Sequence, residues 1–580
     1  MAETGPGNSL AAGGWRRYLL GLRLPLAVLY VLPLAFLLLF YFYPLGSILT
    51  LSFAPAGQVD PSALRRLATT SYFARTLWFT MWQAALSTLL TLTLGLPGAY
   101  VFARYRFPGK SWLQALTTIP FVLPTIVVAN AFTALLGPRG IVNEGLMALF
   151  QLEAPPVQLQ RTVSLILLAH VFYNVTIVLR LVGGFWANLP PPLTEAAQML
   201  GASPWRAFVK ITLPLLAPAL GAAALLVFIF TFTSFGVILI LGGPRFATLE
   251  VEIYRQAVNL FNLPIAAALS LVQIVFMFAL MIIYTRLQAR PTHALDLQSH
   301  HSTQRQPQTW PERGLVWGSV GLMIVLLGAP LAALALRSVS VAGRLSPAYY
   351  QALFADSAQN RTLFFVSPGQ AVSNSLIFAL ATIFTASLLG LLIAIALTAD
   401  GSRAKRGLPN LVDSLFMLPL ATSAVTLGFG YIITLNKPPL NLRTSPMLVV
   451  IAHTLVALPF VIRSLLPALR SIQPVLREAA AVLGASPARV WRAVDLPIAG
   501  RALLVGAVFA FTISLGEFGA TLFIARPDTP TMPVAIFRFL DQPGALSYGQ
   551  ALAMSTLLMG VCAAGFIVIE QFRIGDIGEF

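Results

Sequence analysis

The chain has 580 residues, of which 57% are hydrophobic and only 10% charged, and its mean hydropathy is +0.80. This composition excludes a soluble globular protein, because so little charge cannot cover the surface of a folded chain of this length. The net charge of +17 does not indicate nucleic-acid binding, since no dense basic run with interleaved aromatics is present and cytoplasmic loops of membrane proteins are rich in Lys and Arg.

About twelve apolar runs, each of about 20 residues or more, follow one another along the chain and are long enough to span a bilayer as helices. They are apolar throughout rather than alternating, which predicts helices and not a membrane barrel. We therefore expect an all-α polytopic membrane protein, with helices kinked or broken where prolines such as Pro120 and Pro124 interrupt a run. In chain order the runs are Leu24–Pro44, Thr76–Ala103, Trp112–Leu136, Val163–Trp186, Leu216–Leu241, Pro264–Leu287, Leu315–Leu336, Val372–Ala399, Leu411–Leu435, Met447–Leu469, Ala502–Ile524 and Leu546–Glu570.

A polar stretch at residues 288–314, rich in His, Gln, Ser, Thr and Pro, separates two halves of similar size, residues 1–287 and 315–580. Such a composition cannot bury a core, which predicts a cytoplasmic linker. Each half then holds about six spans. With both termini in the cytoplasm, the cytoplasmic loops hold about 21 Lys and Arg residues and the outer loops about 14, and this excess favours that orientation.

The two halves contain an internal repeat. Residues 195–214 read EAAQMLGASPWRAFVKITLP and residues 478–497 read EAAAVLGASPARVWRAVDLP, an offset of 283 residues (478 − 195). The same offset pairs His170 with His453, with no insertion or deletion between them and the repeat. The halves therefore descend from one duplicated unit. Because each half has an even number of spans, we expect the two to be related by an axis along the membrane normal.

Each copy of the repeat predicts two short helices joined at a glycine. In the first copy Glu195 lies at the positive end of one helix, and Gly201 supplies the left-handed residue that ends it. Ser203 then caps the next helix and Pro204 occupies its first turn. Adjacent alanines keep one helix face flat, so another helix or a partner can approach closely. The second copy repeats these features at Glu478, Ala479, Ala480, Gly484, Ser486 and Pro487.

Both copies resemble the EAA loop of ABC-importer permeases, in which Glu-Ala-Ala is followed by Gly and then by Leu-Pro; here the loops are residues 194–214 and 477–497. The resemblance implies a type I ABC importer fold with two tandem six-helix permease halves. It also implies that both loops form coupling helices that dock on a dimer of cytoplasmic ATPase subunits, while an extracytoplasmic solute-binding protein delivers the solute. The residues to which it assigns coupling are Glu195, Ala196, Ala197, Gly201, Ser203, Pro204, Glu478, Ala479, Ala480, Gly484, Ser486 and Pro487.

The chain itself offers no expected site for a metal, a cofactor or ATP. Cys562 is the single cysteine, and the five histidines lack the spacing of zinc ligands. Gly109-Lys110-Ser111 supplies the end of a phosphate-binding loop, but Arg104 stands where that loop needs its first glycine. We therefore expect a transporter subunit and not an enzyme, located in a bacterial or archaeal cytoplasmic (inner) membrane. By the resemblance, ATP and Mg²⁺ bind to the partner subunit.

Four residues are candidates for the solute pathway. Glu517 lies within an apolar run, where an ionisable group is costly and indicates function. Its counterpart in the first half is the neutral Ser234, and Phe518 and Phe235 follow the two. A lone acid facing the pathway would favour a cationic or metal-bearing solute, whereas a hydrogen bond or ion pair to a neighbouring helix is the structural alternative. The sequence leaves both open.

The solute is expected from a further resemblance. The stretches LGGPRFATLEVEIYRQ from Leu241 and SLGEFGATLFIARPDTPTMPVAIFRFL from Ser514 resemble the fused permeases of thiamine and ferric-iron importers. We expect thiamine or thiamine phosphates, with ferric iron as the alternative. A secondary transporter without an ATPase is the alternative from another class; it too can have parallel repeats, but it does not explain paired EAA loops.

Overall fold

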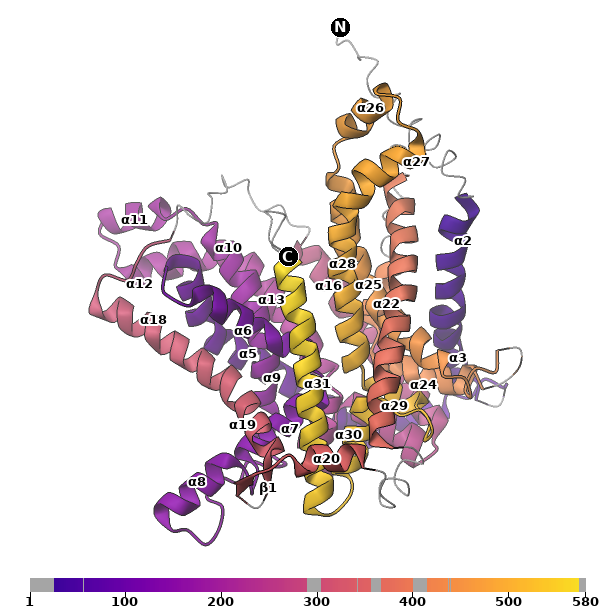
Figure 1. Cartoon of the computed structure of the whole chain (residues 1–580). Coiled ribbons are helices and arrows are strands. Elements are labelled where there is room, and N and C mark those ends of the chain that lie inside the picture. The colour runs from indigo at the N-terminus through magenta and orange to yellow at the C-terminus, as the bar shows by residue number, and fades with distance from the viewer. Residues whose placement is uncertain are drawn as a thin grey trace. The chain divides into compact units, whose positions relative to one another are not determined.

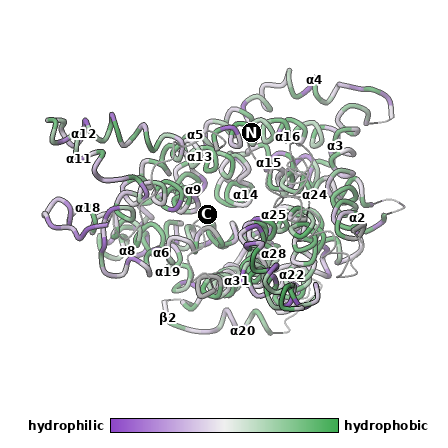
Figure 2. The backbone as a smooth tube through the Cα atoms, turned by 90° about the horizontal axis from the view of Figure 1, so that it is seen from above, coloured by the Kyte–Doolittle hydropathy of each residue, from purple (hydrophilic) through white to green (hydrophobic). Residues whose placement is uncertain are grey.

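The computed structural model describes residues 26–55, 57–288, 304–341, 343–355, 367–399, 415–436, 438 and 440–572 (Figure 1). Within this part of the chain the predicted all-α fold is confirmed, and the strands are one short antiparallel pair, β1 (Ser340–Val341) and β2 (Arg344–Leu345). Eleven helices of the described residues are long and apolar enough to cross a membrane. The hydrophobic colour predominates along them in Figure 2.

The described residues form two compact units. The first-half unit comprises described residues within 52–355 and 536–559, and the second-half unit those within 1–51, 356–535 and 560–574. The helices α30 (Met532–Leu540) and α31 (Ala545–Phe572) contribute residues to both.

The first-half unit contains, in chain order, α4 (Ser62–Thr69), α5 (Ser71–Arg104), α6 (Lys110–Val122), α7 (Thr125–Leu136), α8 (Ile141–Phe150), α9 (Val163–Ile177), η2 (Val178–Val182), α10 (Gly183–Ala187), α11 (Pro192–Met199), α12 (Pro204–Ala207), η3 (Phe208–Thr212), α13 (Leu213–Phe232), α14 (Gly236–Leu241), η4 (Gly243–Arg245), α15 (Leu249–Tyr254), η5 (Arg255–Asn259), α16 (Leu263–Gln288), α18 (Trp310–Met323), η6 (Ile324–Gly328), α19 (Ala329–Ser338), β1, β2 and α20 (Ala348–Phe354).

The second-half unit contains α2 (Leu26–Leu37), η1 (Leu38–Phe42), most of α3 (Tyr43–Phe53), α22 (Pro368–Ala399), η7 (Leu418–Ala421), α24 (Ala424–Thr434), α25 (Met447–Ser471), α26 (Pro474–Val482), α27 (Pro487–Val490), η8 (Trp491–Asp495), α28 (Leu496–Gly516) and α29 (Gly519–Ile524).

The first span of each sequence half packs within the unit of the other half. The first span of the chain lies against α22 and η7, where the Tyr30 hydroxyl donates to the Ala396 carbonyl at 3.0 Å and the Tyr41 hydroxyl hydrogen-bonds Thr422 Oγ1 at 2.6 Å. The span α18–α19 packs on α5 and α7, and Arg337 pairs with Glu144 at 2.6 Å. The compact units are therefore interleaved along the chain, and the division at residues 288–314 stays a prediction about the duplicated sequence.

Part of the predicted linker, residues 289–303, lies outside the described residues. The described end of the linker is held by two backbone hydrogen bonds. The Arg305 amide donates to the Arg104 carbonyl at 2.9 Å, and the Arg106 amide donates to the Arg305 carbonyl at 2.9 Å. Helix α18 begins at Trp310, inside the predicted linker, because Thr309 and Glu312 form a reciprocal capping box.

Each unit is built on the same crossing of three helices, α5, α9–η2 and α13 in one and α22, α25 and α28 in the other. A Cβ at Gly95 would lie 2.9 Å from Val178 Cβ, and one at Gly390 would lie 2.6 Å from Val461 Cγ1. The valines are 283 residues apart (461 − 178), so glycine allows the same close helix approach in both copies.

Three of the predicted spans are interrupted rather than continuous. The run Trp112–Leu136 divides into α6 and α7 because Leu123, which precedes Pro124, is extended. The runs Leu216–Leu241 and Ala502–Ile524 break between α13 and α14 and between α28 and α29. A fourth run, Leu411–Leu435, contains η7 and the short helix α24 among its described residues. The break at Pro124 agrees with the expectation that prolines interrupt the runs, whereas the breaks after α13 and α28 contain no proline and were not predicted.

Candidate functional site

The first predicted coupling segment, called here the first elbow (residues 192–207), folds as the glycine pattern predicts. Gly201 has φ +86°, and its amide donates to the Gln198 carbonyl at 2.9 Å while the Ala202 amide donates to Ala197 at 3.0 Å. This pair of bonds closes a helix on a left-handed glycine. The second elbow (residues 474–490) repeats this closure. Gly484 has φ +79°, its amide donates to the Ala481 carbonyl at 2.9 Å, and the Ala485 amide donates to the Ala480 carbonyl at 3.0 Å.

The start of the second helix in each elbow is less symmetric than predicted. Ser203 Oγ accepts from the Arg206 amide at 3.3 Å, as expected of a cap. The predicted repeat of this cap at Ser486 is wrong, because the Ser486 side chain makes no such bond. The backbone carbonyl of Ser486 instead accepts from the amides of Arg489 and Val490 at 2.8 and 2.9 Å. Pro204 and Pro487 both open their helices.

Both elbows expose their surfaces, including large apolar side chains. Neither α11 nor α26 buries any residue. Met199 and Leu200 are 89% and 90% exposed, and their counterparts Val482 and Leu483 are both 87% exposed. Apolar side chains exposed together at duplicated positions indicate a surface that another molecule covers. Of the twelve predicted coupling residues, nine are exposed and Ala197, Ala480 and Pro487 are half-buried.

An ion pair distinguishes the second elbow from the first. Arg477 on α26 donates through Nε to Asp495 Oδ1 at 2.7 Å, and the Asp495 side chain is fully buried at the start of α28. The corresponding residues of the first half are Thr194 and Thr212, and Thr194 Oγ1 donates to the carbonyl of Pro191, the residue before its elbow. A buried pair therefore ties the second elbow to the helix that follows it, whereas the first half has threonines at both of these positions.

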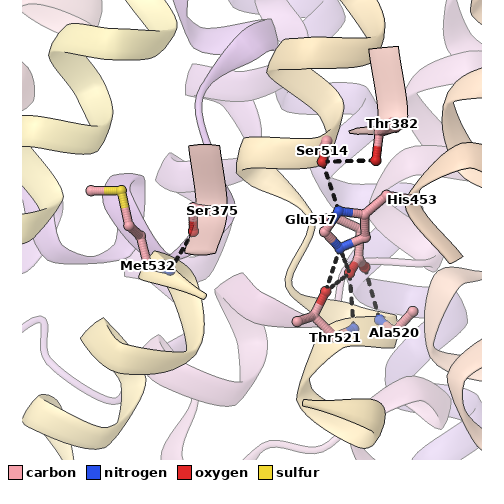
Figure 3. Close-up of polar contacts among 8 residues, drawn as sticks. All are labelled: Ser375, Thr382, His453, Ser514, Glu517, Ala520, Thr521 and Met532. Atoms are coloured by element: carbon pink, nitrogen blue, oxygen red, sulfur yellow. Dashed lines mark hydrogen bonds and ion pairs between the residues drawn. The ribbon is translucent and has the colours of Figure 1, made fainter. Parts of the chain in front are cut away.

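The break between α28 and α29 holds a buried polar cluster (Figure 3). The Glu517 carboxylate accepts from the amides of Ala520 and Thr521 at 2.8 and 2.9 Å and from the Thr521 hydroxyl. It lies 3.5 Å from Nε2 of His453 on α25. The buried carboxylate therefore caps α29 and meets the histidine of a neighbouring helix, as the structural alternative for this residue requires.

His453 connects the cluster to two more helices. Its Nδ1 hydrogen-bonds Ser514 Oγ at 2.7 Å, and its Nε2 hydrogen-bonds Thr521 Oγ1 at 2.8 Å. Ser514 in turn donates to Thr382 Oγ1 on α22 at 3.3 Å. Figure 3 shows this line of contacts from α22 through the histidine to the N-terminus of α29.

The first-half unit has the same arrangement without the acid. His170 on α9 hydrogen-bonds Ser87 Oγ on α5 through Nδ1 and Ser234 Oγ through Nε2, both at 2.9 Å. Ser234 lies in the break between α13 and α14, at the position of Glu517. The structure therefore brings each of these two predicted residues to the repeated histidine of its own unit.

The other two pathway candidates are packed in the interior. Phe235 and Phe518 are 5% and 3% exposed, and the ring of Phe235 meets Tyr254 edge-on with centroids 5.6 Å apart. The hydroxyl partners Ser87, Thr382, Ser514 and Thr521 were not among the predicted residues. A signal for them was present in the sequence, because a histidine repeated in two buried spans needs polar partners on the helices beside it.

A second buried acidic cluster, which the sequence did not single out as a site, lies in the first-half unit. Glu252 on α15 accepts from the Tyr72 hydroxyl at 2.8 Å and from Gln256 Nε2 at 2.6 Å. Glu250 accepts from Gln273 Nε2 on α16. Both glutamates are almost fully buried, and α15 is thereby joined to α5 and α16 by hydrogen bonds to charged groups.

Comparison with known proteins gives matches over most of the chain. The family described as binding-protein-dependent transport system inner membrane component matches residues 92–293. The thiamine transport system permease protein ThiP of Brucella abortus is 26% identical over 505 residues, 86% of this chain and 88% of the relative. The ThiP of Haemophilus influenzae is 25% identical over 551 residues, 94% of this chain and 96% of the relative.

Among solved structures, a bacterial alginate ABC transporter in complex with an alginate pentasaccharide-bound periplasmic protein has a chain 19% identical to this one. The TM-score is 0.40, and the match covers 49% of this chain and 99% of that chain.

The family match includes the first elbow, residues 192–207, and the relatives align with residues of both halves. The helical fold with its many apolar spans is the one expected of such a protein. The chain is therefore similar to binding-protein-dependent transport system inner membrane components over residues 92–293 and to thiamine transport permeases over most of its length.

Proposed function

We propose that this permease forms the solute pathway of an ABC importer and is driven by separate ATPase subunits that dock on its two elbows. The observation that carries the proposal is the pair of exposed apolar tips, Met199-Leu200 and Val482-Leu483, each held at the end of a short helix by a left-handed glycine. Two such surfaces at one repeat offset fit a partner that is itself a dimer.

Each elbow continues into one long helix that leads to a polar break. In the first half η3 and α13 run from the elbow to Ser234, and in the second half η8 and α28 run to Glu517. A helix of 20 residues, such as α13, is about 30 Å long. The break therefore lies about 30 Å from the elbow. When the ATPase moves the elbow, the rigid helix can transmit that movement to the break, as alternating access requires.

The proposed importer also assigns the partners, the nucleotide and the membrane. The partner ATPase dimer binds ATP and Mg²⁺, and the permease chain carries no cofactor. An extracytoplasmic solute-binding protein delivers the solute, and no nucleic acid is involved. The chain lies in a bacterial or archaeal cytoplasmic (inner) membrane, with both termini and both elbows in the cytoplasm, as the distribution of Lys and Arg favours.

The proposed solute is thiamine or thiamine phosphates. Similarity to proteins named thiamine permeases over 86–94% of the chain supports this choice. Ferric iron is the alternative solute. An ATP-independent secondary transporter remains the alternative from another class, and it would leave the exposed apolar tips of the elbows without a partner.

The test uses the whole complex. The tagged full-length chain is expressed with its candidate ATPase and binding protein in cells that lack thiamine uptake and synthesis, and uptake of radiolabelled thiamine is measured. We expect uptake that requires all three proteins, and vanadate-sensitive transport when the purified complex is placed in proteoliposomes. Uptake of ferric iron but not thiamine would reassign the solute. Uptake driven by an ion gradient in the absence of the ATPase would refute the importer mechanism.

A further inference from the structure

The turn between η5 and α16 places an aromatic residue where the backbone favours glycine. Phe261 has φ +53°, in the left-handed region that a bulky side chain seldom adopts. Among the non-glycine residues with positive φ in the described part of the chain, it is the one with an apolar side chain. Two backbone hydrogen bonds close the turn, from the Leu260 amide to the Arg255 carbonyl at 2.9 Å and from the Asn262 amide to the Gln256 carbonyl at 2.7 Å. The turn therefore holds Phe261 in a conformation that costs stability.

The second half has glycine at this position. At the repeat offset of 283 residues Phe261 corresponds to Gly544 (261 + 283), which also has a positive φ, +118°. Glycine adopts such angles without a steric penalty because it has no Cβ. The duplicated fold is therefore built without the aromatic ring in one half, whereas the other half carries the ring together with its backbone strain. Strain that the fold does not require indicates a function for the strained residue.

Packing inside the protein does not offset the strain at Phe261. The residue is 79% exposed, and the preceding Leu260 is 54% exposed. Two apolar side chains exposed on a closed turn contribute little to folding, but they can fill a pocket of another molecule. Aromatic residues are enriched at the centres of protein–protein interfaces, where polar residues form the rim. The polar residues Asn259 and Asn262 flank the apolar pair on the turn.

The turn lies at the end of the first-half unit away from its elbow. Near the end of α5, the ring centroid of Tyr100 is 5.1 Å from that of Trp186, which shortly precedes the elbow. At the start of α5, the Tyr72 hydroxyl donates to Glu252 on α15 at 2.8 Å. Phe261 follows Glu252 by nine residues (261 − 252). With the elbows in the cytoplasm, as proposed, the turn is on the outer side of the membrane.

The turn also lies beyond the apolar part of the neighbouring span. The Leu249 amide at the start of α15 donates to Thr80 Oγ1 at 3.0 Å, whereas Glu252 bonds Tyr72, about two turns closer to the start of α5. Helix α15 and the η5 segment therefore run toward the start of α5 and continue past Tyr72 to Phe261. Because Tyr72 itself precedes the apolar run of α5, this position favours a soluble protein over lipid as the covering molecule.

Exposed arginines are found on the elements at this end of the unit. They lie on α4, which packs on α16, near the start of α5 and at the start of η5, and they are Arg65, Arg66, Arg75 and Arg255. The exposed acid Asp60 beside α4 is already bonded to the amide and hydroxyl of Ser62. A protein that covers Phe261 would therefore be complementary if its apolar pocket were bordered by acidic groups.

We infer that Phe261, with Leu260 beside it, is an anchor on which the extracytoplasmic solute-binding protein docks. The inference rests on the proposed function and deepens it, because it assigns one partner of the importer to a particular surface of this chain. The left-handed turn keeps the ring exposed for an apolar pocket of that protein, and the surrounding arginines meet acidic groups at the rim of the pocket.

The test measures stability and docking in the same variants. Phe261→Gly introduces the residue of the second half and removes the strain, so the unfolding midpoint of the purified full-length chain in detergent should not fall. The probe for docking is the purified solute-binding protein that supports uptake, added to the permease–ATPase complex in nanodiscs. Its affinity for the Phe261→Gly complex should fall at least about tenfold, as expected for the loss of an interface anchor. Phe261→Tyr keeps the ring and should retain most of the affinity.

Phe354→Ser removes another exposed phenylalanine, on α20 of the same unit, and is the matched control; it should leave the affinity unchanged. Equal affinity of the Phe261→Gly complex and the wild type, or an equal loss in the control, would overturn the inference. A lower unfolding midpoint of Phe261→Gly would show that the ring serves the fold, and would overturn it too.

Lipid is the other molecule that could cover the ring. Stronger quenching of Phe261→Trp fluorescence than of wild-type fluorescence by brominated phosphatidylcholine would assign the turn to the membrane and overturn the inference. Uptake that still requires the binding protein in any of these cases would leave the proposed function standing. Uptake by the wild-type complex in the absence of the binding protein would reject the function itself.

Discussion

At the scale of single residues, the two halves place different side chains at their helix breaks. Each half has a helix break inside the protein, and each break leaves backbone amides that need acceptors. In the second half Glu517 accepts two of these amides and meets His453, whereas Ser234 in the first half reaches His170 with a neutral hydroxyl. The acid therefore has a structural task, and a role in the solute pathway stays a prediction beside it.

Replacing Glu517 by leucine should destabilise the protein strongly. The change leaves the Ala520 and Thr521 amides without their buried acceptor, at about 1–3 kcal/mol for each unsatisfied group. Glu517→Gln keeps one acceptor oxygen and should cost less. Thermal unfolding of the purified chain in detergent, followed by fluorescence, gives the order wild type, Gln, Leu. Ser234→Ala is the matched control and should cost less than Glu517→Leu; equal stability of the leucine variant and the wild type would contradict the capping role.

At the scale of elements, local signals predicted the glycine ends of the elbow helices and the proline break at Pro124, but not the breaks at Ser234 and Glu517. Gly201 and Gly484 determine their helix ends through their own φ angles, so the sequence alone placed both elbows. Ser234 at the first of these breaks hydrogen-bonds His170, which is 64 residues away, and the apolar composition of the run does not show whether its helix is continuous or broken. The packing of α2 on α22 is likewise long-range, because contacts such as Tyr30 to Ala396 leave no local pattern.

The helix crossing in the second half should depend on Gly390. A Cβ there would lie 2.6 Å from Val461 Cγ1, so Gly390→Ala should cost about 1–3 kcal/mol, as overpacking does. Val461→Ala removes that methyl group and should recover part of the loss in the double variant, giving a measurable coupling energy. Unfolding midpoints of the four proteins test this. Gly500→Ala, where a Cβ meets nothing within 4 Å, is the control; additive effects of the two changes would rule out the contact.

The ion pair of the second elbow should hold α26 on the start of α28. Arg477→Ala leaves Asp495 buried without this partner, and removing one member of a buried pair costs about 3–5 kcal/mol. Amide hydrogen exchange of α26 should therefore become faster than that of α11 in the same sample. The variant Arg477→Thr/Asp495→Thr, which carries the first-half residues, should restore much of the protection. Unchanged exchange in Arg477→Ala would show that the pair does not hold the elbow.

At the scale of the whole molecule, duplication supplies two copies of the elbow, the proposed docking surface, on one polypeptide. Both elbows repeat the glycine closure and the exposed apolar pair, while the polar breaks and the ion pair differ between the halves. The shared features are those that a symmetric partner would need, and the differing ones are those that a single asymmetric solute could use. This division of similarity indicates that the elbows and the interior have been subject to separate requirements.

Loss of the apolar tips should therefore disrupt association with the ATPase in two steps. Burying one Met or Leu side chain contributes about 1.5–3 kcal/mol, so Met199→Ser/Leu200→Ser in one elbow should weaken docking by about 3 kcal/mol, roughly 100-fold. The other elbow still holds the partner, and linked contacts retain part of the affinity until both are removed. Adding Val482→Ser/Leu483→Ser should abolish association.

Copurification of the ATPase with the tagged permease measures these steps, and solute-stimulated ATP hydrolysis reports whether docking is productive. Serine substitutions at Val31 and Leu32, which are exposed on α2 and belong to neither elbow, are the control and should leave association intact. Because the four elbow side chains are almost fully exposed, their replacement should not change the unfolding midpoint, so a loss of binding will not be a loss of fold. If the fourfold variant still binds and stimulates the ATPase, docking occurs elsewhere on the permease and the elbows have another role.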